Sequence, residues 1–408
     1  MTRVPSNRLA LAFAQVGHSY THLMMLLYPT VVIALERELN MSYGELIVLM
    51  TVGNVLFGVA ALPAGWLGDR WSATGMMCLM YIGMGAGAIV TGLVSTPVGL
   101  ATGLALIGLF AAIYHPVGTS WVVRNAQNRG RALGVNGVFG SLGVASAGLF
   151  AGVLTDLVSW RAAFIVPGVV SIATGIALVV FWRQGRVVDT TVDARPEPAP
   201  QRSAMVRAFI VMSVTMLCGG IMFQCFTAAL PKIFATRMPE VTGGTATGAG
   251  ALVSLVYVLA MGAQLVGGHV ADRYRLRSAY AAVYAVQVPL LLVAAYVGGW
   301  PLFLFATAAT LMNTIAIPTE NSLLSRYSPG RWRATAFGAK FVLSIGVGAL
   351  GVPLVAYLYD STGDFYWFFM ILAALSAIIV IASFWLPREA RRGAPVAADP
   401  RPIQTSGG

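Results

Sequence analysis

The stretch Gly65-Trp66-Leu67-Gly68-Asp69-Arg70 closes one long apolar run, and a related stretch closes another. Gly268-His269-Val270-Ala271-Asp272-Arg273 follows 203 residues later and keeps the glycine, the aspartate and the arginine at the same spacing. Pro29 has a similar counterpart in Pro231. Repeats at a nearly constant offset indicate a duplicated chain, so we expect two related halves.

The composition is that of a chain whose solvent is lipid. Of its 408 residues, 57% are hydrophobic and only 10% are charged, and the mean hydropathy is +0.77. Apolar runs of about 20 residues match the thickness of a bilayer's hydrocarbon core. We therefore predict an all-α membrane protein with twelve transmembrane helices. The predicted spans cover residues 9–35, 44–68, 74–95, 98–122, 132–155, 161–182, 207–235, 246–270, 278–298, 301–325, 334–358 and 365–386.

Polar stretches divide the predicted helices into two bundles of six. Residues 184–206 are rich in Arg, Pro, Asp and Thr, and we predict that they form a flexible cytoplasmic linker. Residues 1–183 then form an N-terminal bundle, and residues 207–386 form a C-terminal bundle. Residues 387–408, rich in Arg, Pro and Ala, are predicted to be a disordered cytoplasmic tail.

The placement of the arginines predicts how the chain crosses the membrane. With the N-terminus in the cytoplasm, 21 of the 26 basic residues fall on the cytoplasmic side, four fall on the outer side, and Lys340 lies inside a span. Cytoplasmic loops of membrane proteins carry an excess of Lys and Arg. We therefore predict a multi-pass protein of the cell inner membrane with both termini in the cytoplasm.

The sequence lacks the motifs of nucleic-acid binding, of ATP hydrolysis and of metal binding. The net charge of +11 is spread over short connections, which argues against a nucleic-acid partner. There is no phosphate-binding loop of the GxxxxGK[ST] type and no histidine, cysteine and carboxylate cluster with metal-ligand spacing. The three cysteines lie inside apolar runs. We expect a monomer in the lipid bilayer that is not an enzyme, has no metal or cofactor, and takes its energy from a gradient.

Three histidines in the predicted spans are candidate site residues. An ionisable group at bilayer depth costs several kcal/mol unless it faces a cavity or a partner. His18 and His22 lie four residues apart and so share one helical face, and His115 lies in another span. A neutral imidazole can donate to a polar substrate, and its titration at about pH 6.5 suits proton exchange. We predict that the three bind substrate or protons; the alternative is interhelical hydrogen bonds that only position the first helix.

Four other polar residues join this candidate site. Lys340 and Glu320 are a lysine and a carboxylate within the second-half spans. Lys340 occupies the repeat position of Asn136, and Gln224 occupies that of His22. We predict that Lys340 either contacts an anion or pairs with Glu320, and a structural ion pair without a transport role is the alternative.

The two repeated stretches resemble the signature loop of the major facilitator superfamily. The resemblance extends to helix count, repeat spacing and linker position, and it implies two pseudo-symmetric six-helix bundles that rock about a central site. The match is imperfect, because Ser72 stands where the family's second glycine is usual. An aspartate at this helix end can accept bonds from a neighbouring helix's N-terminal amides and from arginine. The implied gating residues, with Arg131 as the expected partner of Asp69, are Gly65, Asp69, Arg70, Arg131, Gly268, Asp272 and Arg273.

Two further resemblances point toward efflux. Tyr114-His115-Pro116, together with His18 and His22, is similar to the fosmidomycin-resistance branch of the superfamily, which exports small molecules. A glycine stripe in the fifth predicted helix resembles the superfamily's antiporter motif. The stripe consists of Gly134, Gly143, Gly148 and Gly152.

Three functions remain open from the sequence. The first is proton-coupled export, by alternating access, of a small polar or amphipathic compound. The second is proton-coupled uptake of a small organic anion, with Lys340 as the counter-charge. The third is a membrane receptor that no longer moves solute.

Overall fold

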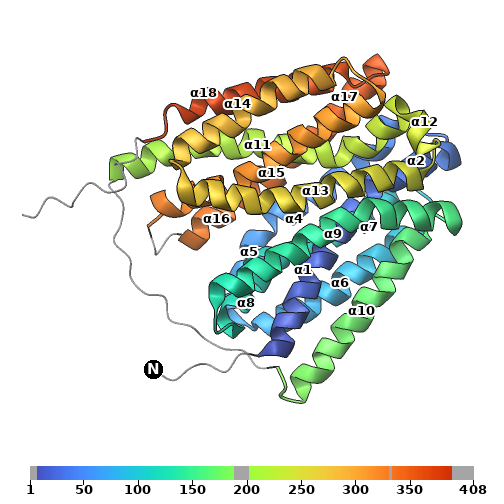
Figure 1. The fold of residues 1–408 in the computed structure, drawn as a ribbon. Helices are drawn as coiled ribbons and strands as arrows, with labels where there is room; N and C mark the ends of the chain where they lie inside the picture. Colours follow the sequence, from blue (N-terminus) through green and yellow to red (C-terminus); the bar gives the residue numbers. More distant parts are fainter. Residues whose placement is uncertain (1–6, 188–201, 330–332, 388–408) are drawn as a thin grey trace, which may run out of the picture.

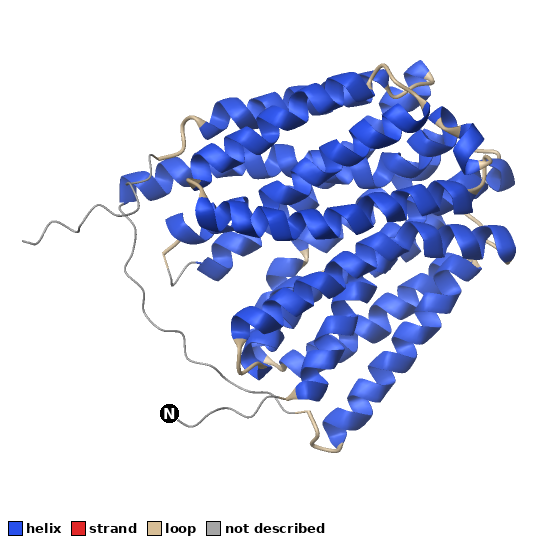
Figure 2. Ribbon diagram, viewed as in Figure 1, coloured by secondary structure: helices blue, strands red, loops and turns tan. Residues whose placement is uncertain are grey.

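Every regular element of the described chain is a helix (Figure 2). The computed structural model describes residues 7–187, 202–329 and 333–387. Within these residues, eleven helical segments are long and apolar enough to cross a membrane. The predicted all-α membrane fold is therefore confirmed. Most of the predicted linker and nearly all of the predicted tail lie outside the described residues, so both stay predictions.

The first predicted span is built in two pieces, α1 (Arg8–Leu26) and α2 (Tyr28–Leu39). Leu27 interrupts the helix between them, and Pro29 lies in the first turn of α2, where a missing amide breaks no helical hydrogen bond. Each piece is too short or too polar to count among the eleven apolar segments. Together they form the first predicted span, which brings the number of spans from eleven to twelve within the described residues.

Several of the other spans consist of consecutive helical elements, with the second formed by α3 to α5, the fourth by α7 to α8, and the eleventh by α16 to α17. The remaining first-half elements are α3 (Tyr43–Ile47), η1 (Val48–Met50), α4 (Thr51–Val59), α5 (Ala61–Arg70), α6 (Ala73–Leu93), α7 (Pro97–Ala111), η2 (Tyr114–Gly118), α8 (Thr119–Asn125), α9 (Arg129–Leu157) and α10 (Ala162–Arg183). The second-half elements are α11 (Arg202–Arg237), α12 (Pro239–Thr242), α13 (Ala246–Arg273), α14 (Leu276–Ala294), α15 (Gly299–Tyr327), α16 (Arg333–Phe341), η4 (Val342–Val347), η5 (Gly348–Leu350), α17 (Gly351–Thr362) and α18 (Tyr366–Ser383).

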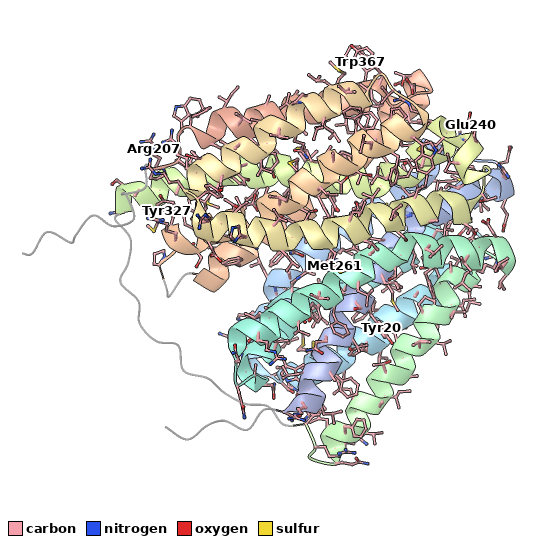
Figure 3. The ribbon with its side chains drawn as sticks, viewed as in Figure 1. Tyr20, Arg207, Glu240, Met261, Tyr327 and Trp367 are labelled. Atoms are coloured by element: carbon pink, nitrogen blue, oxygen red, sulfur yellow. The ribbon has the colours of Figure 1, made fainter. Side chains whose placement is uncertain are left out.

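The helices of the two halves of the chain lie on opposite sides of the molecule (Figure 1). Helix α1 begins and α18 ends at the same end of the bundle, which we call the termini end. The opposite end, where α2 and α17 end, we call the far end. Among the labelled side chains, Arg207 lies at the termini end and Glu240 at the far end (Figure 3).

Two helix pairs join the halves through glycine. Helix α9 packs along α13, and a Cβ atom on Gly148 or on Gly250 would collide with the backbone of the other. Helix α4 crosses η4 in the same way, because a Cβ atom on Gly58 would meet the backbone of Gly346. Small residues allow helix backbones to approach closely where lipid offers no hydrophobic drive for association.

Two aspartates tie the halves together at the far end. Asp360, at the end of α17, accepts hydrogen bonds from the backbone amide of Gly44 at 3.0 Å and from the Ser42 hydroxyl at 2.7 Å. Asp156, at the end of α9, accepts one from the backbone amide of Thr247 at 2.7 Å. Each carboxylate thus caps the exposed N-terminal amides of a helix in the other half, where the helix dipole favours negative charge.

A partly buried ion pair adds to this closure. Lys232 of α11 lies 2.7 Å from Glu36 of α2, with 13% and 21% of their side chains exposed. The ammonium group also lies over the rings of Tyr43 and Tyr359, at 5.6 and 5.4 Å. Because the partners come from different halves, the pair resists separation of the far ends.

Replacing both capping aspartates by asparagine should loosen the far end. Each contact involves an exposed carboxylate, and together they stabilise the closed arrangement by about 2 kcal/mol. The ratio of separated to closed far ends should therefore rise roughly 30-fold. Spin labels at the exposed positions Val98 and Glu240, on different halves, would report this as a longer-distance population in pulsed electron resonance.

The matched control is Asp364→Asn. Asp364 pairs with Arg237 at 2.6 Å within the second half, so its loss should leave the distance distribution unchanged. An unaltered distribution in the Asp156→Asn/Asp360→Asn variant would contradict the assigned role of the two caps.

Candidate functional site

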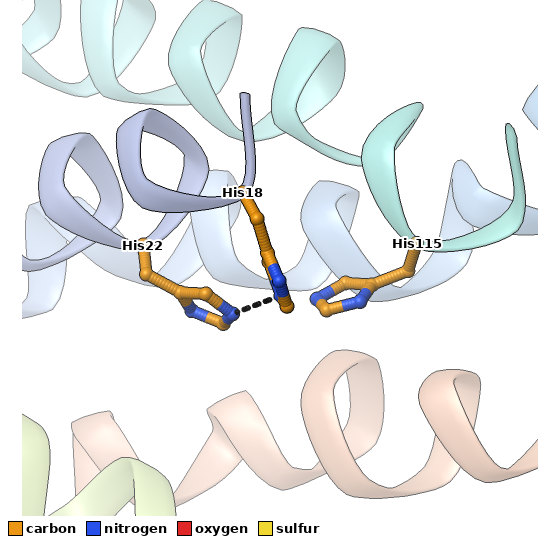
Figure 4. A group of neighbouring side chains, drawn as sticks. All are labelled: His18, His22 and His115. Carbon is orange, nitrogen blue, oxygen red and sulfur yellow. Dashed lines mark hydrogen bonds between the residues drawn. The ribbon is translucent and has the colours of Figure 1, made fainter. Parts of the chain in front are cut away.

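The three predicted histidines lie together, although they come from two helices (Figure 4). His18 and His22 project from α1, and His115 projects from the π-helical turn η2. One ring nitrogen of each lies within 4.8 Å of the others, and every side chain is partly exposed. The three rings point toward one another (Figure 4).

Hydrogen bonds fix how the first two neutral rings carry their protons. His18 Nδ1 lies 2.7 Å from the carbonyl oxygen of Asn136, and His22 Nε2 lies 3.2 Å from His18 Nε2. A carbonyl only accepts, so His18 Nδ1 carries the proton and His18 Nε2 is an acceptor. His22 Nε2 therefore donates to His18, which leaves His22 Nδ1 with a lone pair.

Tyr114 and Asn136 hold this arrangement from the side. The Tyr114 ring stacks on His18 with 4.5 Å between centroids, and its hydroxyl donates to Asn136 Oδ1 at 2.5 Å. Asn136 is 3% exposed and thus orients both neighbours through its side chain and its backbone. Pro116 removes an amide from this stretch, and π-helical turns of this kind are frequent at functional sites.

His115 faces the second half of the chain. Its ring stacks on Phe341 of α16, with centroids 4.7 Å apart, and lies 5.5 Å from Phe57 of α4. Its Nε2 atom is buried and has no hydrogen-bond partner among the residues that the structure describes. The histidine group is thus in direct contact with both halves.

A second polar cluster lies in the C-terminal half, next to Phe341 in sequence. Lys340 Nζ lies 2.7 Å from Glu320 Oε1 and donates to Asn321 Oδ1 at 2.6 Å. The Tyr280 hydroxyl donates to Glu320 Oε2 at 2.7 Å. About one tenth of each charged side chain is exposed. The predicted Lys340–Glu320 pair forms, and both charges are compensated.

Gln224 does not join either cluster through a hydrogen bond. It is 5% exposed, and its Nε2 donates to the carbonyl oxygen of Ile345 at 3.4 Å. Ile345 belongs to the π-helical turn η4, and its carbonyl oxygen also accepts the backbone amide of Gly348. Gln224 therefore links α11 to the eleventh span.

The gating residues of the first half lie at the termini end, but the expected pairing of Asp69 with Arg131 is wrong. Arg124 of α8 donates to Asp69 Oδ1 at 2.9 Å, while Arg131 is exposed at the start of α9. Arg124 lies on the neighbouring fourth span, whereas Arg131 begins the next helix. The Asp69 side chain is 70% exposed, and the pair lies wholly within the first half.

The remaining gating residues are placed as follows. Arg70 lies over the Trp66 ring at 4.3 Å, and Gly65 packs against Pro116. In the second repeated stretch, Asp272 and Arg273 are exposed at the end of α13. A Cβ atom on Gly268 would meet no described atom within 4 Å.

The glycine stripe of α9 allows neighbouring helices to pack closely against it. A Cβ atom on Gly143 would collide with the backbone of Ser19 in α1, and one on Gly152 with the backbone of Ala246 in α13. Gly148 meets Gly250, as described above, while Gly134 faces no neighbour. The stripe thus lets α9 approach both halves.

Sequence reasoning missed the metal-ligand geometry and the aromatic contacts. The spacing His18-x-x-x-His22 was visible, but the third histidine comes from another helix, so no local motif marks the group. Phe341 and Tyr280 look like ordinary apolar filler in the sequence. For Phe341, its position next to Lys340 in the sequence was the available signal.

The helices form two groups, and a polar cluster lies on each side of the contact between His115 and Phe341. This arrangement is typical of polytopic membrane transporters. Residues 16–339 and 212–405 match the model of the Major Facilitator Superfamily. The chain therefore belongs to this superfamily, whose members are transporters and not enzymes.

Curated relatives share parts of the sequence. The puromycin resistance protein of Streptomyces alboniger is 29% identical over 31% of this chain and 26% of its own length. The tetracenomycin C resistance and export protein of Streptomyces glaucescens is 28% identical over 45% and 33%. A probable L-galactonate transporter of Escherichia coli is 26% identical over 39% and 36%. The matches thus span about a quarter to a third of these relatives.

Solved structures share the fold over nearly the whole chain. A POT family transporter in complex with a thioalcohol-conjugated peptide has a TM-score of 0.75 at 14% identity, covering 93% of this chain and 96% of that one. A bacterial homologue of the human lysosomal transporter Spinster, in an inward-facing and occupied conformation, has a TM-score of 0.72 at 14% identity, covering 94% and 95%.

The Glu320→Gln variant should be strongly destabilised. It leaves the Lys340 charge buried without its counter-ion, which costs about 3–5 kcal/mol for a buried pair. Adding Lys340→Met should recover most of the loss, since the remaining groups carry no net charge. Thermal unfolding in detergent would compare the three proteins; a double variant no more stable than Glu320→Gln would contradict this account of the pair.

Proposed function

We propose that the protein is a proton-coupled exporter of a small polar or amphipathic compound. The observation that carries the proposal is the pair of polar clusters, one in each half, that meet where His115 stacks on Phe341. Polar groups persist at membrane depth when they line a pathway or face a partner. In this proposal the histidine group and its neighbours contact the substrate.

Alternating access is the proposed mechanism. The contacts of Asp156, Asp360 and Lys232 hold the far end shut, and in this state Asp69 bonds within its own half. With the termini end in the cytoplasm, this arrangement corresponds to an inward-open state with the Asp69 gate released. The outward-open state then requires the far-end contacts to break.

The Lys340–Glu320 pair is the proposed proton-coupling element. Protonation of Glu320 would remove the negative charge that holds Lys340 at 2.7 Å. The ammonium would then keep only Asn321 as its partner, so one proton would change the charge balance beside the contact between the halves. Coupling of this kind needs a carboxylate whose ionisation changes between the two conformations.

The proposed direction of transport is inferred from the curated relatives. Two of the three curated relatives are resistance proteins, one of them named for export, and this favours efflux. The L-galactonate relative favours the alternative, uptake of an organic anion. Against that alternative, Lys340 is already neutralised by Glu320 and offers no unpaired positive charge in this state.

Transport by purified protein in proteoliposomes tests the proposal. A labelled panel of puromycin, tetracenomycin C and L-galactonate would be offered with and without an imposed pH gradient. We expect gradient-driven movement of at least one resistance compound by the native protein. The Glu320→Gln/Lys340→Met variant should move it at a rate that no longer responds to the gradient.

The outcomes separate the alternatives. Gradient-driven accumulation of L-galactonate alone would replace export by anion uptake. A double variant that keeps the full response to the pH gradient would remove the ion pair from proton coupling.

A further inference from the structure

The histidine group has the geometry of a metal-ligand set. Ligand nitrogens of tetrahedral zinc lie about 2.0–2.1 Å from the ion, and so roughly 3.3 Å from one another. His18 Nε2 and His22 Nε2 are already 3.2 Å apart. One ring nitrogen of each of the three histidines lies within 4.8 Å of one ring nitrogen of each of the others. Because rotation about the last torsion of histidine is soft, His115 can close the remaining distance by turning its ring.

The surroundings of the rings also fit a metal site. Ligating histidines generally donate their other ring N–H to a backbone carbonyl or a carboxylate, which fixes ring orientation and tautomer. His18 makes this contact with the carbonyl oxygen of Asn136. The buried Nε2 of His115 has no partner, so it is available to an ion without loss of an existing bond.

We propose that His18, His22 and His115 bind a late first-row divalent transition-metal ion such as Zn²⁺, Ni²⁺ or Co²⁺. Imidazole is a preferred ligand of these ions. The His22–His18 hydrogen bond gives way to two bonds to the ion, and the ring proton of His22 moves from Nε2 to Nδ1, so that both Nε2 atoms offer a lone pair. The three neutral rings hold it without a carboxylate and leave a fourth position open for water or for a donor atom of a small chelator.

Binding by three neutral ligands is reversible, which suits a site that must load and release. A closed structural site with four protein ligands would hold the ion too firmly for that purpose. The metal-binding proposal rests on the geometry of the three histidines alone. That the ion is transported with the substrate rests on the proposed function. The ion enters either free or on a small chelator, and both supply the same metal chemistry to the three rings.

Cobalt titration of the purified protein tests the site directly. Co²⁺ serves as the probe because its visible absorption reports coordination number, and the protein would be purified with a tag that contains no histidine. We expect one Co²⁺ per chain and the intense bands of a four- or five-coordinate ion. His22→Ala and His115→Gln should each weaken binding more than about 100-fold, because even loss of a group that only orients a ligand costs about 10- to 100-fold.

His269 provides the matched control, since it is the fourth histidine of the chain and is exposed at the termini end of α13. His269→Ala should bind Co²⁺ like the native protein. Thermal unfolding of each variant without metal verifies folding, and His115→Gln preserves a polar side chain if His115→Ala does not fold. Titration with Co²⁺ alone and with Co²⁺ in excess free histidine distinguishes a free ion from a chelate.

The proposal is overturned if no four- or five-coordinate spectrum develops, or if binding is unchanged in both His22→Ala and His115→Gln. It is also overturned if His269→Ala alone abolishes binding. None of these outcomes depends on transport, so a failure of the site is distinguishable from a failure of the proposed export.

Discussion

Polar groups inside an apolar bundle must be paired, and the rest of this structure depends on that constraint. Glu320 and Lys340 are each about nine-tenths buried, and each has a second polar partner besides the other. His18 and His22 are satisfied by Asn136 and by one another. Because hydrocarbon offers no hydrogen bonds, such groups persist only where the chain supplies their partners or water reaches them. Within the histidine group, His115 has a buried nitrogen that lacks a partner among the described residues, and it lies where the two halves meet.

Two kinds of contact hold the halves together. Their central contacts are glycine against backbone, which carry no charge and allow one helix to roll on another. The directional contacts lie at the far end, where Asp156 and Asp360 occupy equivalent places in the repeat and cap equivalent helices of the opposite half. Exposed charge-assisted bonds are individually weak, so they can hold one conformation without making it permanent. Glycine crossing points between the halves and weak caps at one end support the proposed rocking of the two halves.

Much of this was accessible from the sequence. Apolar run length predicted the spans, and the repeat of Gly65 to Arg70 at Gly268 to Arg273 predicted the duplication, because both signals are local. The Lys340–Glu320 pairing was one of two alternatives that the sequence offered for Lys340, because two opposite charges within the spans have few other partners. Side-chain partners set by helix rotation were not predictable: Arg124, not Arg131, reaches Asp69, and His115 meets His18 and His22 only through the packing of η2 against α1. No local spacing encodes such contacts.

The central claim is that the histidine group lies on a water-accessible route open toward the termini end. The most direct measurement is the reactivity of a cysteine at position 22 toward a membrane-impermeant thiol reagent, in a chain whose three buried cysteines are replaced by alanine. The account predicts modification from the termini side and none at position 287, whose glutamine is fully buried between α14 and α15. A cysteine at position 22 that resists the reagent from both sides of the membrane, yet reacts after denaturation, would contradict it.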